Sequence, residues 1–145
     1  MTAQAAEVWL RCATPLHAVE HVSANHTPEG LAIRATKTIH ASDPYLNGHF
    51  PGCTIFPGVF IIENLRQAVA IAVGESYGLL PAILTLRSVR FLAPLVPGDR
   101  ITLDATLRSV PGERRFDVAA HYQRSDGVLV AQLKVQFCYG DLPCD

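Results

Sequence analysis

Two hydrophobic periods alternate along the chain and predict where its strands and its helix lie. Within residues 31–39, Leu31, Ile33 and Ala35 alternate with polar residues, and this period of two is typical of a half-buried strand. Residues 16–23 give a weaker strand signal. Four later segments have the same strand-like composition: 83–92, 100–109, 115–124 and 128–139. Turn sequences rich in Pro, Gly, Ser and Asp separate these four, so we expect an antiparallel meander.

The segment that starts at Pro57 and ends near Gly74 has the composition of a helix. Proline fits the first turn of a helix, where its missing N–H costs nothing. The segment is apolar almost all round, and a helix of this kind is buried by the rest of its protein. With 145 residues the chain is expected to form one domain, 1–145, of the α+β class. An antiparallel sheet wrapped around one long central helix would bury that helix.

Composition excludes several classes of function. Hydrophobic residues make up 49% of the chain and charged residues 17%, which favours a globular protein with a large core, and a net charge of −1 gives no sign of nucleic-acid binding. Four cysteines show no CxxC pair or metal-ligand spacing, so free thiols are preferred over a disulfide or a zinc site. The sequence shows no signal peptide and no uncharged apolar run of about 18 residues, which predicts a cytoplasmic protein without a membrane span.

The candidate chemistry lies where a loop rich in Pro, Gly, Asn and Asp meets the helix. This loop, 41–56, contains His49, and Glu63 follows inside the apolar helix. A carboxylate among apolar side chains is costly to bury unless it is neutral or paired. A buried acid within reach of a histidine is a common acid–base arrangement, although Glu63 could also be a structural acid paired with Arg66 and His49 a structural loop residue.

Two sequence blocks resemble one known family. GHFPG, FPGVFIIE and then Gln67 give a His-Phe-Pro loop, a Pro-Gly helix start, an acid fourteen residues after the histidine and a glutamine one turn later. The second block, VRFLAPLVPGD, covers 89–99. Together they resemble the β-hydroxyacyl-(acyl-carrier-protein) dehydratases of fatty-acid and polyketide synthesis, which have the hot-dog fold.

The resemblance implies dehydration of a β-hydroxyacyl thioester to the trans-2-enoyl product, with His49 and Glu63 as the catalytic pair. We expect His49 to act as base and Glu63, its pKa raised by burial, as acid. The backbone N–H of Gly58, in the first helical turn, can hold the thioester oxygen, and Gln67 is expected to orient Glu63. No metal or redox cofactor is needed.

The resemblance also implies partners. It predicts a homodimer whose sites combine His49 of one chain with Glu63 of the other, and an acyl carrier protein that brings the substrate. A patch for this acidic carrier could come from the arginines of the strand region: Arg87, Arg90, Arg100, Arg108, Arg114, Arg115 and Arg124.

Two alternatives remain open: a hot-dog acyl thioesterase, and a non-catalytic subunit of a heterodimeric dehydratase. Arg66 bears on the second, because it stands where the family usually has a small residue and can reach Glu63 along one helix face. An ion pair would lower the pKa of Glu63, so we expect Arg66 to point away; a bidentate pair would favour the non-catalytic alternative.

Overall fold

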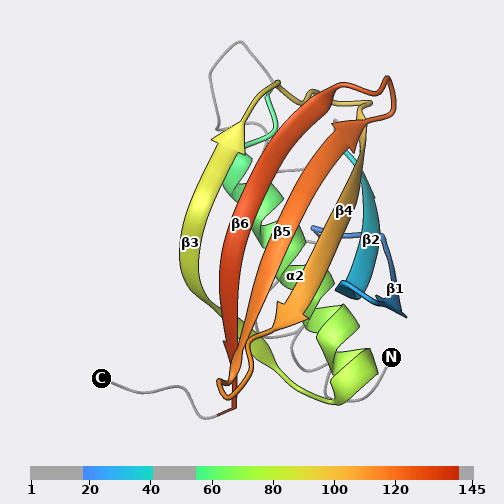
Figure 1. Cartoon of the computed structure of the whole chain (residues 1–145). Helices are drawn as coiled ribbons and strands as arrows, with labels where there is room; N and C mark the ends of the chain where they lie inside the picture. The colour runs from blue at the N-terminus through green and yellow to red at the C-terminus, as the bar shows by residue number, and fades with distance from the viewer. Residues whose placement is uncertain (1–17, 41–54, 141–145) are drawn as a thin grey trace.

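A computed structural model describes residues 18–40 and 55–140 of the chain (Figure 1). This part contains six strands and one long helix, α2 (Gly58–Tyr77). The strands are β1 (His21–Thr27), β2 (Gly30–Thr38), β3 (Pro81–Phe91), β4 (Arg100–Ser109), β5 (Arg115–Arg124) and β6 (Leu129–Tyr139). Within these residues no helix combines the length and the hydrophobicity that crossing a membrane requires.

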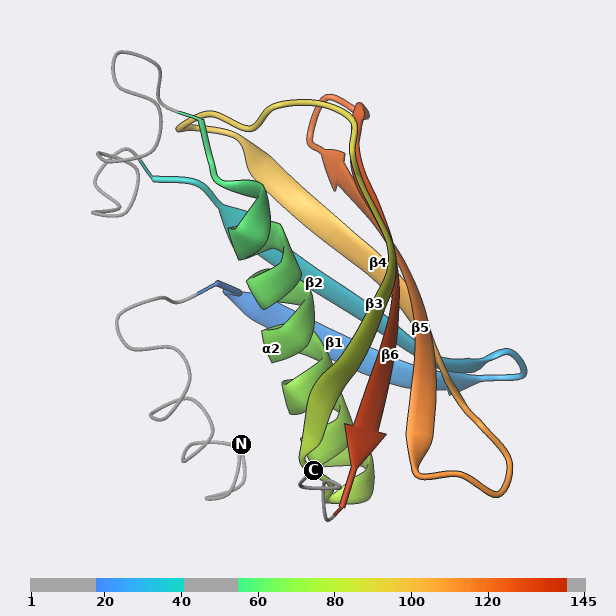
Figure 2. The same ribbon diagram turned by 90° about the vertical axis from the view of Figure 1, so that its left-hand side faces the viewer.

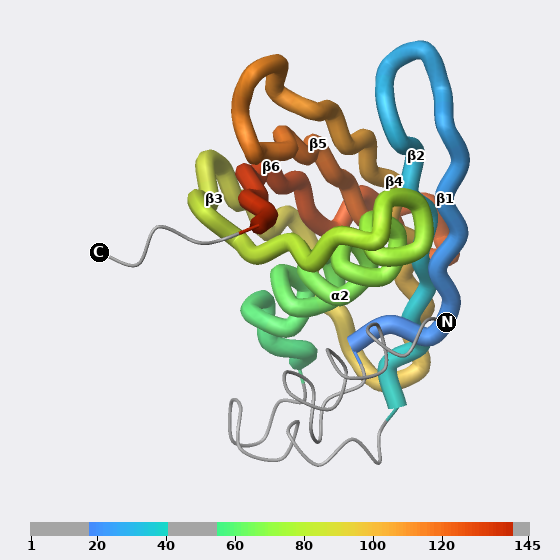
Figure 3. The backbone as a smooth tube through the Cα atoms, turned by 90° about the horizontal axis from the view of Figure 1, so that it is seen from below, coloured from blue at the N-terminus to red at the C-terminus, as the bar shows by residue number. Residues whose placement is uncertain are grey.

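The strands form one antiparallel sheet that curls around α2. The helix lies along the inner face of the sheet and is flanked by β1 and β2 on one side and by β3 on the other (Figures 2 and 3). Alternate residues of β2, β4, β5 and β6 point inward and are buried, as their period of two predicts. The predicted architecture, an antiparallel sheet around one central helix, is therefore confirmed.

The order of the strands differs from a simple meander of four. The order across the sheet is β1-β2-β4-β5-β6-β3, so β4, β5 and β6 are consecutive neighbours while β3 pairs with β6 at the far edge. The expectation of a four-stranded meander was wrong in its first strand. The physical reason is the way the sheet curls around the helix. After β3 the chain crosses to the other side of the sheet, where β4 pairs with β2. Strand β3 then packs against the side of α2 that β1 and β2 leave uncovered.

Helix α2 begins and ends with the residues that its sequence suggests, but it runs further than predicted. Pro57, with an extended backbone, precedes its first turn. Gly78 ends it in the left-handed conformation, with φ 66°, and donates its N–H to the carbonyl of Gly74 at 3.0 Å. Gly74 itself remains helical, because the exposed residues up to Tyr77 add a further turn.

Candidate active site

Glu63 lies in the second turn of α2, where its carboxylate accepts three hydrogen bonds. Arg66 donates two of them, from Nε to Oε2 at 2.8 Å and from Nη2 to Oε1 at 2.5 Å. Gln67 donates the third, from Nε2 to Oε1 at 2.9 Å. The Glu63 and Arg66 side chains are 22% and 19% exposed, so this is a half-buried, bidentate ion pair within one chain.

The position of Arg66 overturns the expectation that it points away from Glu63. Residues three apart lie on the same face of a helix, so the side chain of Arg66 reaches the carboxylate of Glu63 and pairs with it. A bidentate pair of this kind favours the second alternative, a non-catalytic subunit of a heterodimeric dehydratase.

The pKa of Glu63 is also shifted in the direction opposite to the one expected. Burial alone would raise this pKa, but the hydrogen bonds from Arg66 and Gln67, together with the charge of Arg66, outweigh burial and lower it from 4.5. Glu63 is therefore ionised at neutral pH, and the expected raised pKa was wrong.

Gln67 lies where the sequence places it, one turn after Glu63 and in contact with its carboxylate. Its other amide atom, Oε1, accepts the backbone N–H of Ala18 at 3.2 Å. Ala18 directly precedes the β1 region, and its carbonyl accepts a hydrogen bond from Asn64 Nδ2. Tyr122, on β5, donates to Asn64 Oδ1 at 2.7 Å.

Sequence reasoning missed this polar cluster of Ala18, Asn64 and Tyr122. One signal for it exists, because an asparagine inside an apolar helix is costly to bury without partners. Nothing in the sequence identifies those partners, since Ala18 contributes only backbone atoms.

Gly58 is the first residue of α2 and lines an apolar hollow of about 510 Å³. The walls come from the start of the helix, from Phe91 at the end of β3 and from the segment that follows it, including Pro94. A Cβ atom at Gly58 would lie 2.7 Å from ring carbons of Phe91, so a larger residue here would have to displace that ring, which belongs to a half-exposed side chain. The hollow thus lies beside the start of α2, and its walls are mainly apolar.

His49 and Cys53 lie outside the described residues, as does most of their loop, 41–54. The structure therefore leaves the predicted proximity of His49 and Glu63 as a prediction. Among the described residues, no group of three or more His, Cys, Asp or Glu side chains is arranged to hold a metal ion.

Comparison with curated proteins places the chain among dehydratases. It is 31% identical over 115 residues to the 3-hydroxyacyl-(acyl-carrier-protein) dehydratase FabZ of Fusobacterium nucleatum, covering 79% of this chain and 80% of that protein. It is 41% identical over 94 residues to the FabZ of Cronobacter sakazakii, covering 61% of this chain and 62% of that protein. The second match thus spans less than two thirds of its relative.

Solved structures show the same fold. The Escherichia coli PaaI protein of the phenylacetic acid degradation operon superposes with a TM-score of 0.67, at 21% identity, over 94% of this chain and 93% of that one. The dehydratase heterocomplex ApeI:P of Xenorhabdus doucetiae gives a TM-score of 0.58 at 18% identity, over 82% and 99% of the two chains. These likenesses and the sheet around one helix confirm the hot-dog fold. The sequence model of the ApeI-like family, described as ApeI dehydratase, matches residues 24–133, and the chain belongs to this family of dehydratases.

Proposed function

We propose that the protein removes water from β-hydroxyacyl thioesters carried by an acyl carrier protein and releases trans-2-enoyl thioesters. Membership of a dehydratase family and the likeness to FabZ support this hydro-lyase activity. The structural observation that carries the proposal is the carboxylate of Glu63, which Arg66 and Gln67 hold in one orientation on an otherwise apolar helix.

The reaction needs one group that accepts a proton and another that donates one. Because Glu63 is ionised at rest, we assign it the role of acceptor: it takes the proton from Cα, and the electrons of that C–H bond form the Cα=Cβ double bond. The hydroxyl leaves from Cβ, and His49, as an imidazolium, supplies the proton that makes it water. Proton transfer from Glu63 to His49 then restores both groups.

This division of roles is the reverse of the one expected from the sequence. The reason is how often the Glu63 carboxyl group is protonated at neutral pH. A carboxyl group with a lowered pKa is almost never protonated at neutral pH, so it is a poor donor, whereas its ionised form is present in full.

The start of α2 can stabilise the charge that develops on the thioester oxygen. The first N–H groups of a helix have no carbonyl four residues earlier within the helix to bind, and the helix dipole is positive there. In α2 the N–H of Phe60 donates instead to the carbonyl of Pro57 at 3.0 Å. The backbone N–H of Gly58 lies in this turn, beside the apolar hollow. We therefore propose that it donates a hydrogen bond to the enolate-like oxygen.

Substitution of the two proposed catalytic residues tests the function. Glu63→Gln and His49→Ala should each lower kcat for dehydration by at least ~100-fold, since general acid–base groups contribute about 10²–10⁴. The double variant should lose little more than either single one, because both groups act in one transition state. Near-wild-type turnover by either folded variant contradicts the assignment.

One observation favours a second candidate, the non-catalytic subunit of a heterodimeric dehydratase. The Arg66–Glu63 ion pair occupies the carboxylate that catalysis would use. Incubation of the purified chain with β-hydroxyacyl and saturated acyl thioesters separates the candidates: water loss identifies a dehydratase, thiol release a thioesterase, and neither product a supporting subunit.

The active assembly is proposed to be a homodimer served by a carrier protein. Strand β3 forms one edge of the sheet and exposes Leu84 and Leu86, and a second copy would cover both the edge and the leucines. The expected sharing of His49 and Glu63 between subunits belongs to this proposal.

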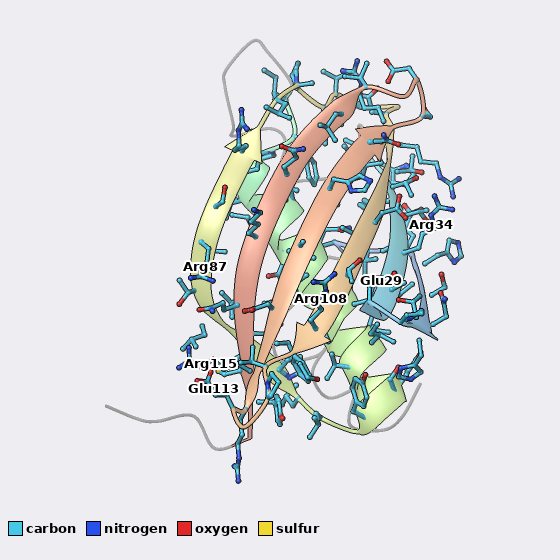
Figure 4. The ribbon with its side chains drawn as sticks, viewed as in Figure 1. Glu29, Arg34, Arg87, Arg108, Glu113 and Arg115 are labelled. Carbon is cyan, nitrogen blue, oxygen red and sulfur yellow. The ribbon has the colours of Figure 1, made fainter. Side chains whose placement is uncertain are left out.

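Several arginines of the expected carrier patch have partners within the chain. Arg115 pairs with Glu113 at 3.2 Å, and Arg108 donates to the carbonyl of Glu29 at 2.9 Å (Figure 4). Arg124 pairs with Asp126 at 2.9 Å. Arg87 lies on β3, at the sheet edge, so we propose that the carrier protein binds nearer to this strand.

A further inference from the structure

A chain of hydrogen bonds connects strand β5 to the carboxylate of Glu63 through the interior of the protein. Tyr122, Asn64 and Gln67 are 0%, 1% and 2% exposed, and the backbone of Ala18 is enclosed with them. Buried polar groups stabilise a fold only when their hydrogen bonds are satisfied, and here each side chain has at least one partner. Burying polar side chains costs more free energy than burying apolar ones of similar size. This cost indicates that the cluster has a role beyond packing.

The backbone of Ala18 determines which amide atom of Asn64 and which amide atom of Gln67 faces it. Its carbonyl can only accept, so Asn64 must present Nδ2 to it and must present Oδ1 to the hydroxyl of Tyr122. Its N–H can only donate, so Gln67 must present Oε1 to it. The remaining atom of Gln67, the donor Nε2, then necessarily faces Glu63.

The two oxygens of Glu63 end up with unequal surroundings. Oε1 accepts from Gln67 Nε2 and from Arg66 Nη2, which uses both of its lone pairs. Within residues 18–40 and 55–140, Oε2 accepts only from Arg66 Nε, which leaves it one lone pair. A proton that arrives from the substrate therefore has a place on Oε2.

We propose that Asn64 and Tyr122 are positioning residues that hold Ala18 and Gln67 so that Gln67 fixes Oε1 of Glu63 and leaves Oε2 as the reacting oxygen. The hydrogen bonds link helix α2 to β5 and to the chain just before β1, three parts of the fold that are far apart in sequence. The carboxylate is thus tied to the body of the protein as well as to its own helix. This inference deepens the proposed dehydratase function and rests on it for its kinetic consequence.

The first experiment does not depend on activity. The pKa of the Glu63 carboxyl is measured by NMR titration of the full-length protein labelled with ¹³C at glutamate side chains, and Glu63→Gln identifies the signal. Asn64→Leu should raise this pKa, because Ala18 is released and Gln67 no longer donates to Oε1 in a fixed orientation. Tyr122→Phe, which keeps the ring, should raise it by less, and Gln67→Leu should raise it most.

A matched control separates positioning from loss of stability. Val118 is also buried on the inner face of β5, but it is apolar. Val118→Ala should lower the melting temperature and leave the pKa of Glu63 unchanged. In the Gln67→Leu background, Asn64→Leu should cause no further shift, because Gln67 is the only proposed route from Asn64 to the carboxylate.

The second experiment measures kinetics on a β-hydroxyacyl thioester. Asn64→Leu should lower kcat by about 10-fold and Tyr122→Phe by about 3-fold, with KM changed less than about twofold, because a misplaced reacting group slows the step without weakening binding. Val118→Ala should keep the wild-type kcat.

The outcomes distinguish failure of this inference from failure of the proposed function. A wild-type protein without dehydratase activity refutes the function, and the NMR titration still decides the inference. A pKa of Glu63 that stays unchanged in Tyr122→Phe and Asn64→Leu, while Gln67→Leu raises it, overturns the inference whatever the activity. Should Asn64→Leu not fold, Tyr122→Phe compared with Gln67→Leu suffices for the decision.

Discussion

At the scale of single residues, Arg66 decides the charge of the proposed catalytic carboxylate. The sequence shows that Arg66 can reach Glu63, but spacing alone does not determine which rotamer is occupied. Burial alone would raise the pKa of Glu63, but the two hydrogen bonds from Arg66 and the one from Gln67 outweigh it. The positions of Glu63 and Gln67 were predictable from the sequence, whereas the protonation state was not.

Removing this guanidinium should change how activity depends on pH. In Arg66→Met the hydrogen bonds and the positive charge that lower the pKa of Glu63 are lost, so burial raises that pKa. A proton acceptor must be ionised, and activity falls as pH drops through its pKa. We therefore expect the acid limb of the profile of kcat/KM against pH to move to higher pH.

The control for this variant is Arg34→Met, which removes an exposed ion pair with Asp104 and should leave the profile unchanged. A variant at Arg66 that gains activity at neutral pH would contradict the proposed roles. That result would show that Glu63 works as the acid.

The same ion pair predicts how stability depends on pH. Glu63 has a lower pKa in the folded than in the unfolded chain, so its contribution is present above the unfolded pKa and is lost as pH falls through the folded pKa. The free energy of unfolding of the wild type should therefore exceed that of Arg66→Met near neutral pH. Chemical denaturation at a series of pH values below about 4.5 should show this difference shrinking.

At the scale of elements, turn chemistry made the boundaries of the hairpin strands predictable. Strands β4 and β5 begin and end where the sequence places them, because Pro, Gly and Asp residues mark both of their ends. The end of α2 was harder to predict, since a glycine can either end a helix or lie within it. Gly74 lies within this one, and Gly78 ends it.

The contact between the first turn of α2 and the end of β3 supports a prediction about Gly58. In Gly58→Ala the added Cβ displaces the ring of Phe91 into the apolar hollow, which narrows the approach to the first-turn N–H. We expect kcat/KM to fall by about 10-fold, as a small misplacement of the reacting groups suffices for that. Stability should change little, because alanine is favoured over glycine in a helix by about 1 kcal/mol and offsets the displacement.

Gly74→Ala in the same helix is the matched control. A Cβ there meets nothing closer than 3.9 Å, so this variant should be more stable and equally active. Recovery of activity in the double variant with Phe91→Ala would confirm that the ring is responsible. Full activity in Gly58→Ala would show that substrate does not pass this turn.

At the scale of the whole molecule, the order of the strands was the part that the sequence could not provide. Periodicity shows which face of a strand is buried, but not which strand is its neighbour. The sheet therefore places β3 at an edge, beside β6, although the pattern of turns suggested a neighbour in β4. The edge position of β3, with Leu84 and Leu86 exposed on it, is the observation that supports the proposed dimer.

A charged side chain introduced on the exposed edge strand β3 should prevent the proposed dimer from forming. Leu86 is 46% exposed on β3, and Leu86→Lys should give a monomer by light scattering, with activity lowered by at least ~10-fold if each site needs both chains. Val128→Lys, at another exposed apolar position in the turn before β6, is the control and should remain dimeric and active.

Mixing two inactive variants tests whether the site is shared. When His49→Ala and Glu63→Gln exchange subunits at random, half of the dimers are hybrids and each hybrid has one intact site. About a quarter of the wild-type activity should therefore return. No recovery after demonstrated subunit exchange would mean that both residues come from one chain.

The contact at Ala18 has a consequence for how this site would be traced among relatives. Asn64 binds the main-chain carbonyl at this position and Gln67 binds the main-chain N–H. Every amino acid except proline supplies both groups. The side chain of residue 18 has only to be small, because Ala18 is fully buried. Residue identity at this position can therefore drift during evolution while the contact persists, and a comparison of sequences would detect the two amides but not the backbone segment that orients them.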